Sequence, residues 1–178
     1  GLVCGLTARW YPRAELIEGA TRGQTKLSLR REIPRICAEL GQGGARYLVF
    51  LTDADEADWR EKRDREVRLV PERYRIFAVY AVADRNVECW LAADPASLAS
   101  ALGVEPSALA EAPDPKGIIE SALRPLSRAE KIKRVADFVA SAPLPRWIRA
   151  SRSFRAFYED VRALTLREEC EFPNEREG

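Results

Sequence analysis

Two short runs of apolar residues stand out in the first half of the chain. Tyr47–Leu51 lies between a glycine-rich turn and a group of acids, and Arg75–Val82 is apolar or aromatic after its arginine. Runs of this length, rich in β-branched and aromatic residues, are typical of strands buried on both faces of a parallel sheet. The charged, helix-like segment 58–70 between them predicts the crossover that joins two parallel strands. We therefore expect an α/β core in the first half.

The residues before these strands predict a helix and a further strand. Apolar residues recur at helical spacing from Leu27 to Leu40. Pro34 lies inside that pattern, so a kink or a break is expected there. The short apolar run Ala14–Ile17 predicts a strand.

The second half of the chain has the periodicity of helices. Ser127–Glu130 matches a capping box, and the aromatic and aliphatic residues of Ser151–Leu164 fall on one helical face. We expect one domain over residues 1–178, with an α/β core at 1–85, a helical extension packed on it at 86–166, and a frayed tail at 167–178.

Composition narrows the chemistry. Lys and Arg total 29 and Asp and Glu total 28, so the net charge of +1 excludes a global polycation but leaves a local basic face open. The absence of His excludes Ser-His-Asp and Cys-His nucleophilic sites and His-ligated zinc, which leaves carboxylates, Lys, Arg, Tyr, Cys or a metal held by oxygen ligands.

The cysteines and the apolar content indicate where the protein works. Four widely spaced Cys without a C-x-x-C pair predict free thiols and a reducing cytoplasm. No stretch approaches the roughly 18 apolar residues of a membrane helix, so we expect no membrane partner. Because the chain starts at Gly1 and contains no Met, we expect its start to be a processing or truncation boundary.

Acidic residues directly after the first apolar strand are the foremost candidates for chemistry. Asp53 and Asp55 follow Tyr47–Leu51, at the strand end where open α/β sheets bind ligands. An Asp-x-Asp there can place two carboxylates on one Mg²⁺. The alternative is that Asp53 caps the next helix and the other acids complement its dipole.

A second acidic group follows the second strand. Asp84 closes that strand, and Glu88 falls in the first turn of the next helix, so both can face the same sheet edge as Asp53. Asp94 is expected to cap a later helix. The alternative for Glu88 is an acid on an exposed helix face that complements the dipole.

Basic residues offer candidate phosphate contacts. Lys26 and Arg22 lie in a glycine-containing loop at a helix start, although a solvated helix start is the alternative. A lopsidedly basic region predicts part of a nucleic-acid path; it comprises Arg128, Lys131, Lys133, Arg134, Arg146, Arg149, Arg152 and Arg155. Tryptophans 59, 90 and 147 are expected to anchor the core.

The order of these blocks resembles the DUF4276 family, a Toprim-like group related to OLD nucleases. The resemblance covers about residues 14 to 164 and rests on the following blocks: Gly23–Lys26, Leu51–Asp55, Glu88–Pro95, Asp114–Lys116 and Ser151–Phe157. It implies a Toprim-like, mostly parallel sheet flanked by helices, with a helical C-terminal half. It also implies Mg²⁺ or Mn²⁺ held by Asp53 and Asp55, with Glu88 completing or flanking the site.

The resemblance is incomplete at the N-terminus. The family's first strand ends in Glu-Gly, and Leu2–Trp10 corresponds to the helix after it, so we expect that catalytic Glu upstream of Gly1. Glu18 is the replacement candidate if the alignment is shifted.

The resemblance implies a metal-dependent endonuclease acting on DNA in preference to RNA, in phage defence or DNA repair, with an ABC-type ATPase partner. One alternative is a non-catalytic Toprim-like interaction module of a defence complex, and a homodimer stays open. Another is a small-molecule phosphatase, for which the required Thr and Lys motifs are missing.

Overall fold

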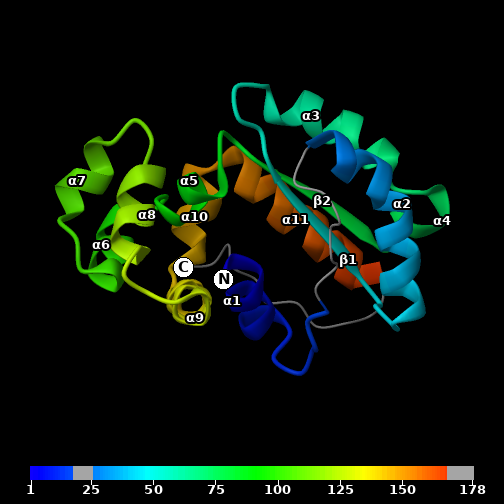
Figure 1. Ribbon diagram of the computed structural model, residues 1–178, viewed down its shortest axis with the longest axis horizontal. Coiled ribbons are helices and arrows are strands. Elements are labelled where there is room, and N and C mark those ends of the chain that lie inside the picture. Colours follow the sequence, from blue (N-terminus) through cyan, green and yellow to red (C-terminus); the bar gives the residue numbers. More distant parts are fainter. Residues whose placement is uncertain (18–25, 168–178) are drawn as a thin grey trace.

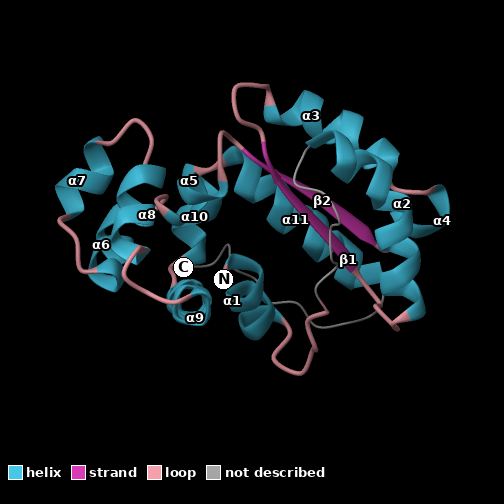
Figure 2. Cartoon of the chain, viewed as in Figure 1, coloured by secondary structure: helices cyan, strands magenta, loops and turns pink. Residues whose placement is uncertain are grey.

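The centre of the fold is a pair of parallel strands. The computed structural model describes residues 1–17 and 26–167, with side chains described except for 26–31 and 167. Strand β1 (Leu48–Asp53) pairs with β2 (Ala78–Ala83) in register from Leu48 opposite Ala78 to Asp53 opposite Ala83 (Figure 2). This pair confirms the predicted α/β core with parallel strands.

Helices cover both faces of this sheet. The chain passes from β1 to β2 through α3 (Trp59–Glu66), the 3₁₀ turn η1 (Val67–Leu69) and α4 (Glu72–Arg75). Helix α2 (Lys26–Gln42) and α3 lie on one side of the strands, and α11 (Arg152–Arg167) lies on the other (Figure 1).

The two strands differ in burial. Successive side chains of a strand point to opposite faces, so Tyr80 and Val82 of β2 enter the core beneath α2 and α3. Val79 and Ala81 enter the second core, beneath α11, and β2 is therefore buried on both faces as predicted. The same prediction for β1 is wrong, because Val49 is 43% exposed.

The remaining helices pack into the larger core, which contains the fully buried Trp90, Trp147 and Phe154. They are α1 (Leu2–Trp10), α5 (Val87–Leu91), α6 (Pro95–Leu102), α7 (Pro106–Glu111), α8 (Lys116–Leu123), α9 (Arg128–Ser141) and α10 (Leu144–Ala150). The phenyl ring of Phe154 meets the indoles of Trp90 and Trp147 edge-to-face at 5.3 Å each, which confirms the predicted anchoring role of these tryptophans.

The predicted capping box of Ser127 and Glu130 is confirmed at the start of α9. The break considered at Pro34 is not found, because α2 continues through this residue as a single helix. The strand predicted at Ala14–Ile17 is wrong: these described residues form no regular element, and Leu16 is 47% exposed.

The predicted division into a core at 1–85 and an extension at 86–166 stays a prediction. Helix α1 packs against α9, and α11 covers β2, so the second half of the chain packs on the first. The predicted tail falls, from residue 168 onward, outside the described residues. The Toprim identity of the α/β fold stays a prediction. Within the described part of the chain, no helix has both the length and the apolar character needed to span a bilayer.

Candidate functional site

Two loops meet beyond the carboxyl ends of the strands. Past the sheet, the amide of Ala54 donates to the carbonyl of Ala83, and that of Asp55 donates to the carbonyl of Arg85, both at 2.8 Å. Asp55 and Arg85 have φ values of 58° and 63°, in the left-handed region that residues other than glycine seldom adopt. The loop after β1 is thus tied to the loop after β2.

Asp53 points across this edge towards α5. Its Oδ1 accepts the backbone N–H of Val87 at 3.0 Å, in the first turn of α5, whose N-cap is Asn86. The sequence alternative, in which Asp53 caps the helix after its own strand, is wrong. Asp58 caps α3 instead, accepting the amides of Arg60 at 2.8 Å and Glu61 at 3.2 Å.

Glu88 lies in that same turn of α5, half-buried, and its Oε2 is buried without a hydrogen-bond partner. Burial raises the pKa of Glu88. Its hydrogen bond to the backbone and the charge of Lys116 lower this pKa, and the charges of Asp53 and Glu120 raise it. Asp53 accepts the N–H of Val87, the residue directly before Glu88, so both acids lie at the carboxyl edge of the strands. The prediction that Asp53 and Glu88 share one sheet edge is therefore supported by the structure.

Asp55 contacts a different group. Its Oδ2 lies 3.9 Å from Nζ of Lys62, a buried side chain that also donates to the backbone carbonyl of Asp53. The same ammonium lies 4.0 Å from Oε1 of Glu66, whose Oε2 accepts the hydroxyl of Tyr80 at 3.0 Å. These residues line a pocket of about 450 Å³ beside α3. The ammonium group of Lys62 therefore lies between the carboxylates of Asp55 and Glu66.

The other predicted residues have separate positions. Asp84 is exposed, while buried Asp94 accepts the hydroxyl of Ser97 at 2.7 Å and the guanidinium of Arg146 at 3.1 Å. Asp94 is bound within the fold and lies outside the candidate site. Lys26 is the first residue of α2 and its side chain is not described, and Arg22 and Glu18 lie outside the described residues.

Lys116, at the start of α8, is a site residue that the sequence did not reveal. Its backbone N–H donates to Oδ1 of Asp114 at 3.0 Å, and the same oxygen accepts Nδ2 of Asn86 at 3.2 Å. Asp114 thus joins the start of α8 to the start of α5 and brings a cation near Glu88. The block Asp114–Lys116 predicted only a helix start, so the pattern alone carried no signal for this role.

The described residues provide two carboxylates for a cation. Within residues 1–17 and 26–167, no group of three or more His, Cys, Asp or Glu side chains has an arrangement that could hold a metal ion. Two carboxylates still suit Mg²⁺, which keeps several waters and takes further ligands from a substrate phosphate. The Oε2 atom of Glu88, buried without a hydrogen-bond partner, is of the type that can serve as a ligand of Mg²⁺.

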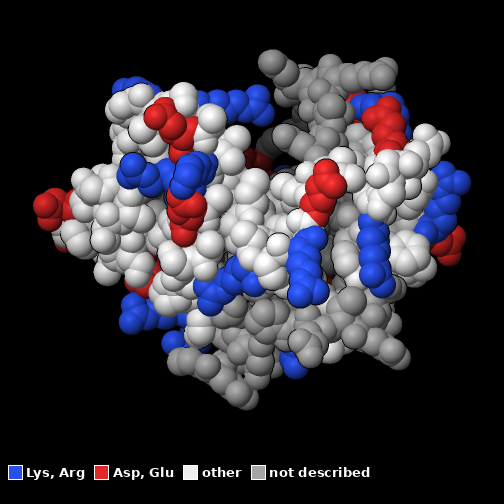
Figure 3. Space-filling view, turned by 90° about the horizontal axis from the view of Figure 1, so that it is seen from below, with Lys and Arg blue, Asp and Glu red and all other residues white. Residues whose placement is uncertain are grey.

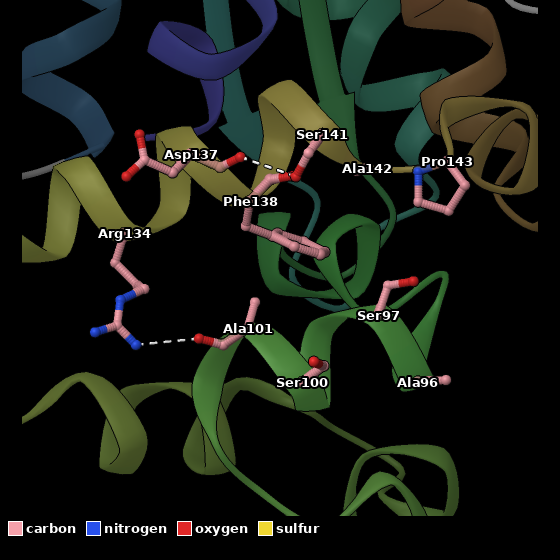
Figure 4. Close-up of a pocket in the computed structure, with 10 residues that line it drawn as sticks. All are labelled: Ala96, Ser97, Ser100, Ala101, Arg134, Asp137, Phe138, Ser141, Ala142 and Pro143. Atoms are coloured by element: carbon pink, nitrogen blue, oxygen red, sulfur yellow. Dashed lines mark hydrogen bonds between the residues drawn. The ribbon is translucent and has the colours of Figure 1, made fainter.

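A larger hollow of about 690 Å³ lies between α6 and α9 (Figure 4). Arg134 spans it by donating to the carbonyl of Ala101 at 3.1 Å, and Ser141 donates to the carbonyl of Asp137 at 3.1 Å. None of the predicted catalytic or metal-binding residues lines it.

Charges of both signs occupy the surface. On the face shown in Figure 3, Lys and Arg side chains of the described residues stand beside Asp and Glu. This mixture of charges agrees with the net charge of +1, so a basic surface would have to be local.

Comparisons with protein-family models, curated proteins and solved structures find no match to this chain. The resemblance to the DUF4276 family therefore stays a prediction made from the sequence blocks.

Proposed function

We propose that this chain is a nuclease-like protein that acts on nucleic-acid phosphodiester bonds with Mg²⁺ or Mn²⁺ held by Asp53 and Glu88. The observation that carries the proposal is the Oε2 atom of Glu88, buried without a partner in the electrostatic reach of Asp53. A buried carboxylate oxygen with no donor is costly, and a hard divalent cation supplies the missing interaction.

The chain's own residues divide the work. Asp53 and Glu88 would hold the ion, which when bound polarises a phosphoryl oxygen and activates water. Lys116 would attract the phosphate, since its charge already reaches Glu88. Asp55 is not assigned as a ligand of the ion, because the ammonium of Lys62 already lies 3.9 Å from its Oδ2. An ABC-type ATPase partner and a role in phage defence or DNA repair stay predictions of the family resemblance.

The first test is Mn²⁺ binding, followed by electron paramagnetic resonance or calorimetry. Glu88→Gln and Asp53→Asn keep the size of each side chain, and the side-chain amide oxygen introduced by Asp53→Asn can still accept the Val87 N–H. We expect each to weaken Mn²⁺ binding at least about tenfold, as loss of a charged ligand does. Asp64→Asn, on the exposed face of α3, is the matched control and should bind like the wild type.

The second test is cleavage of plasmid and oligonucleotide DNA with Mg²⁺ or Mn²⁺. We expect cleavage by the wild type and the Asp64→Asn control but not by Glu88→Gln. Absence of Mn²⁺ binding by the wild type, or equal binding by all variants, would refute the assignment of these ligands.

A further inference from the structure

Four arginines follow one another at intervals of three residues where α10 joins α11. Arg146 and Arg149 lie on α10, and Arg152 and Arg155 lie on α11; all four are exposed. We refer to these four residues as the arginine ridge. The aromatic side chains between them, those of Trp147 and Phe154, are fully buried, and each of the four cationic side chains is exposed to solvent.

Ser153, next to Arg152 of the ridge, connects the start of α11 to the candidate site by hydrogen bonds. Ser153, which lies between Arg152 and Phe154, accepts the backbone N–H of Asp84 on its Oγ at 3.1 Å. It also accepts the indole N–H of Trp90, on α5, at 2.7 Å. The start of α11 is thus fixed against the end of β2 and against the helix that carries Glu88.

The guanidinium groups of Arg146 and Arg155 are held in place by hydrogen bonds. Arg155 donates from Nε to the carbonyl of Ile148 at 2.9 Å and from Nη2 to that of Arg149 at 3.4 Å, at the end of α10. Arg146 donates one N–H to buried Asp94 while its own side chain stays 61% exposed. Groups ordered in advance lose less entropy when they bind, and their remaining donors suit the oxygens of a phosphate.

Two basic residues of α9 also have partners within the fold. Lys133 pairs with Asp137 on the helix surface, and Arg134 donates to the carbonyl of Ala101. Arg152, by contrast, has no hydrogen bond or ion pair to another side chain among the described residues. Of the basic region predicted from the sequence, the α10–α11 part lies beside the site, because Ser153 accepts hydrogen bonds from Asp84 and Trp90.

We propose that the arginine ridge binds the phosphodiester backbone of a nucleic-acid strand and leads it to the carboxyl edge of β1 and β2. This inference rests on the proposed function, because it names the surface that holds the substrate of that site. Contacts of this type neutralise phosphates and carry little base specificity, so binding should depend strongly on salt.

The test measures binding of a fluorescein-labelled oligonucleotide by anisotropy at several salt concentrations, in EDTA so that no metal contributes. The test variant is Arg149→Gln with Arg152→Gln. The control is Arg68→Gln with Arg124→Gln, which removes the same charge from exposed positions outside the basic region predicted from the sequence. Circular dichroism and thermal melting verify that both fold.

Each lost phosphate contact reduces the slope of log affinity against log salt by about 0.7 to 0.9. We therefore expect the ridge variant to reduce the slope by about 1.5 and the control to leave it unchanged. Equal weakening of both variants would overturn the proposal, because bulk charge would then explain binding. It is also overturned if the wild type fails to bind the oligonucleotide at low salt, or if it binds only vesicles of acidic phospholipid.

The outcome is separable from that of the proposed function. Glu88→Gln should bind the oligonucleotide in EDTA like the wild type, because Glu88 is not part of the ridge. Ridge-dependent binding without Mn²⁺ binding would refute the metal site alone. Mn²⁺ binding without ridge-dependent oligonucleotide binding would refute the ridge alone.

Discussion

Replacing Ser153 with alanine should destabilise the protein far more than loss of one hydroxyl usually does. The Ser153 side chain is buried, with a residue exposure of 2%, and its Oγ accepts the indole N–H of fully buried Trp90 at 2.7 Å. It also accepts the backbone N–H of Asp84 at 3.1 Å. Ser153→Ala removes the acceptor of both donors without changing their burial.

The magnitude follows from what each donor loses. A buried donor left without a partner costs about 1 to 3 kcal/mol. The Trp90 indole has no route to water, so it takes most of that penalty, whereas the Asp84 amide lies beside an exposed side chain that water can reach. Together these losses predict a decrease of about 2 to 3 kcal/mol in the free energy of unfolding.

Urea denaturation followed by tryptophan fluorescence and by circular dichroism measures this change, with an unchanged m-value as the sign of pure destabilisation. Ser107→Ala, on the exposed surface of α7, is the control and should stay within about 0.5 kcal/mol of the wild type. In a Trp90→Phe background, which lacks the indole donor, Ser153→Ala should cost about 1 to 2 kcal/mol less. A cost below about 0.5 kcal/mol in the wild type, or no coupling with Trp90, would refute the reasoning.

Two further predictions concern Glu88 and the contact of α1 with α9. Burial raises the pKa of Glu88, so the folded protein keeps a proton that the unfolded chain has released. Stability should therefore fall as pH rises from the ordinary glutamate pKa through the raised one, and Glu88→Gln should lose this part of the pH dependence in urea titrations at a series of pH values. A methyl group at Gly5 would lie 2.6 Å from both the carbonyl oxygen of Ala136 and Cβ of Val139, so Gly5→Ala should cost about 1 to 3 kcal/mol in thermal melts. Gly117→Ala, with no atom within 4 Å of the new Cβ, should instead stabilise α8 by about 0.5 to 1 kcal/mol, and a similar effect of both substitutions would contradict the packing argument.

The pattern of apolar residues predicted most of the fold, because each long helix buries one apolar stripe and β2 is buried on both faces. It failed at Ala14–Ile17, where a short apolar run has no neighbouring strand to pair with among the described residues. It also failed for the burial of β1, since the exposure of Val49 depends on which elements cover that strand. Such coverage is a property of the tertiary structure and has no local signal.

The candidate site was predictable to the extent that parallel strands end at one edge. That rule predicted that Asp53 and Glu88 share one edge, and Asp53 does accept the N–H of Val87, the residue directly before Glu88. Asp53 and Asp55 line the same pocket, but β1 ends at Asp53, and Asp55 has a φ of 58° and lies beside Lys62. The approach of Lys62 and Lys116 depends on the packing of α3 and α8, which the spacing of residues does not encode.

The position of Glu88 is fixed by contacts that do not involve its own carboxylate. The loop before it is held by the bond from Asp55 N–H to the carbonyl of Arg85 and by the bond from Asp84 N–H to Ser153. The helix start is held by Asp53 through the amide of Val87. These bonds together keep Oε2 of Glu88 buried even though it lacks a donor, which is the condition in which an added cation gains most. Asp55 already has the ammonium of Lys62 beside it, so the same cation would gain less there. The preference for Glu88 over Asp55 as the partner of Asp53 thus follows from which carboxylate the fold has left unsatisfied.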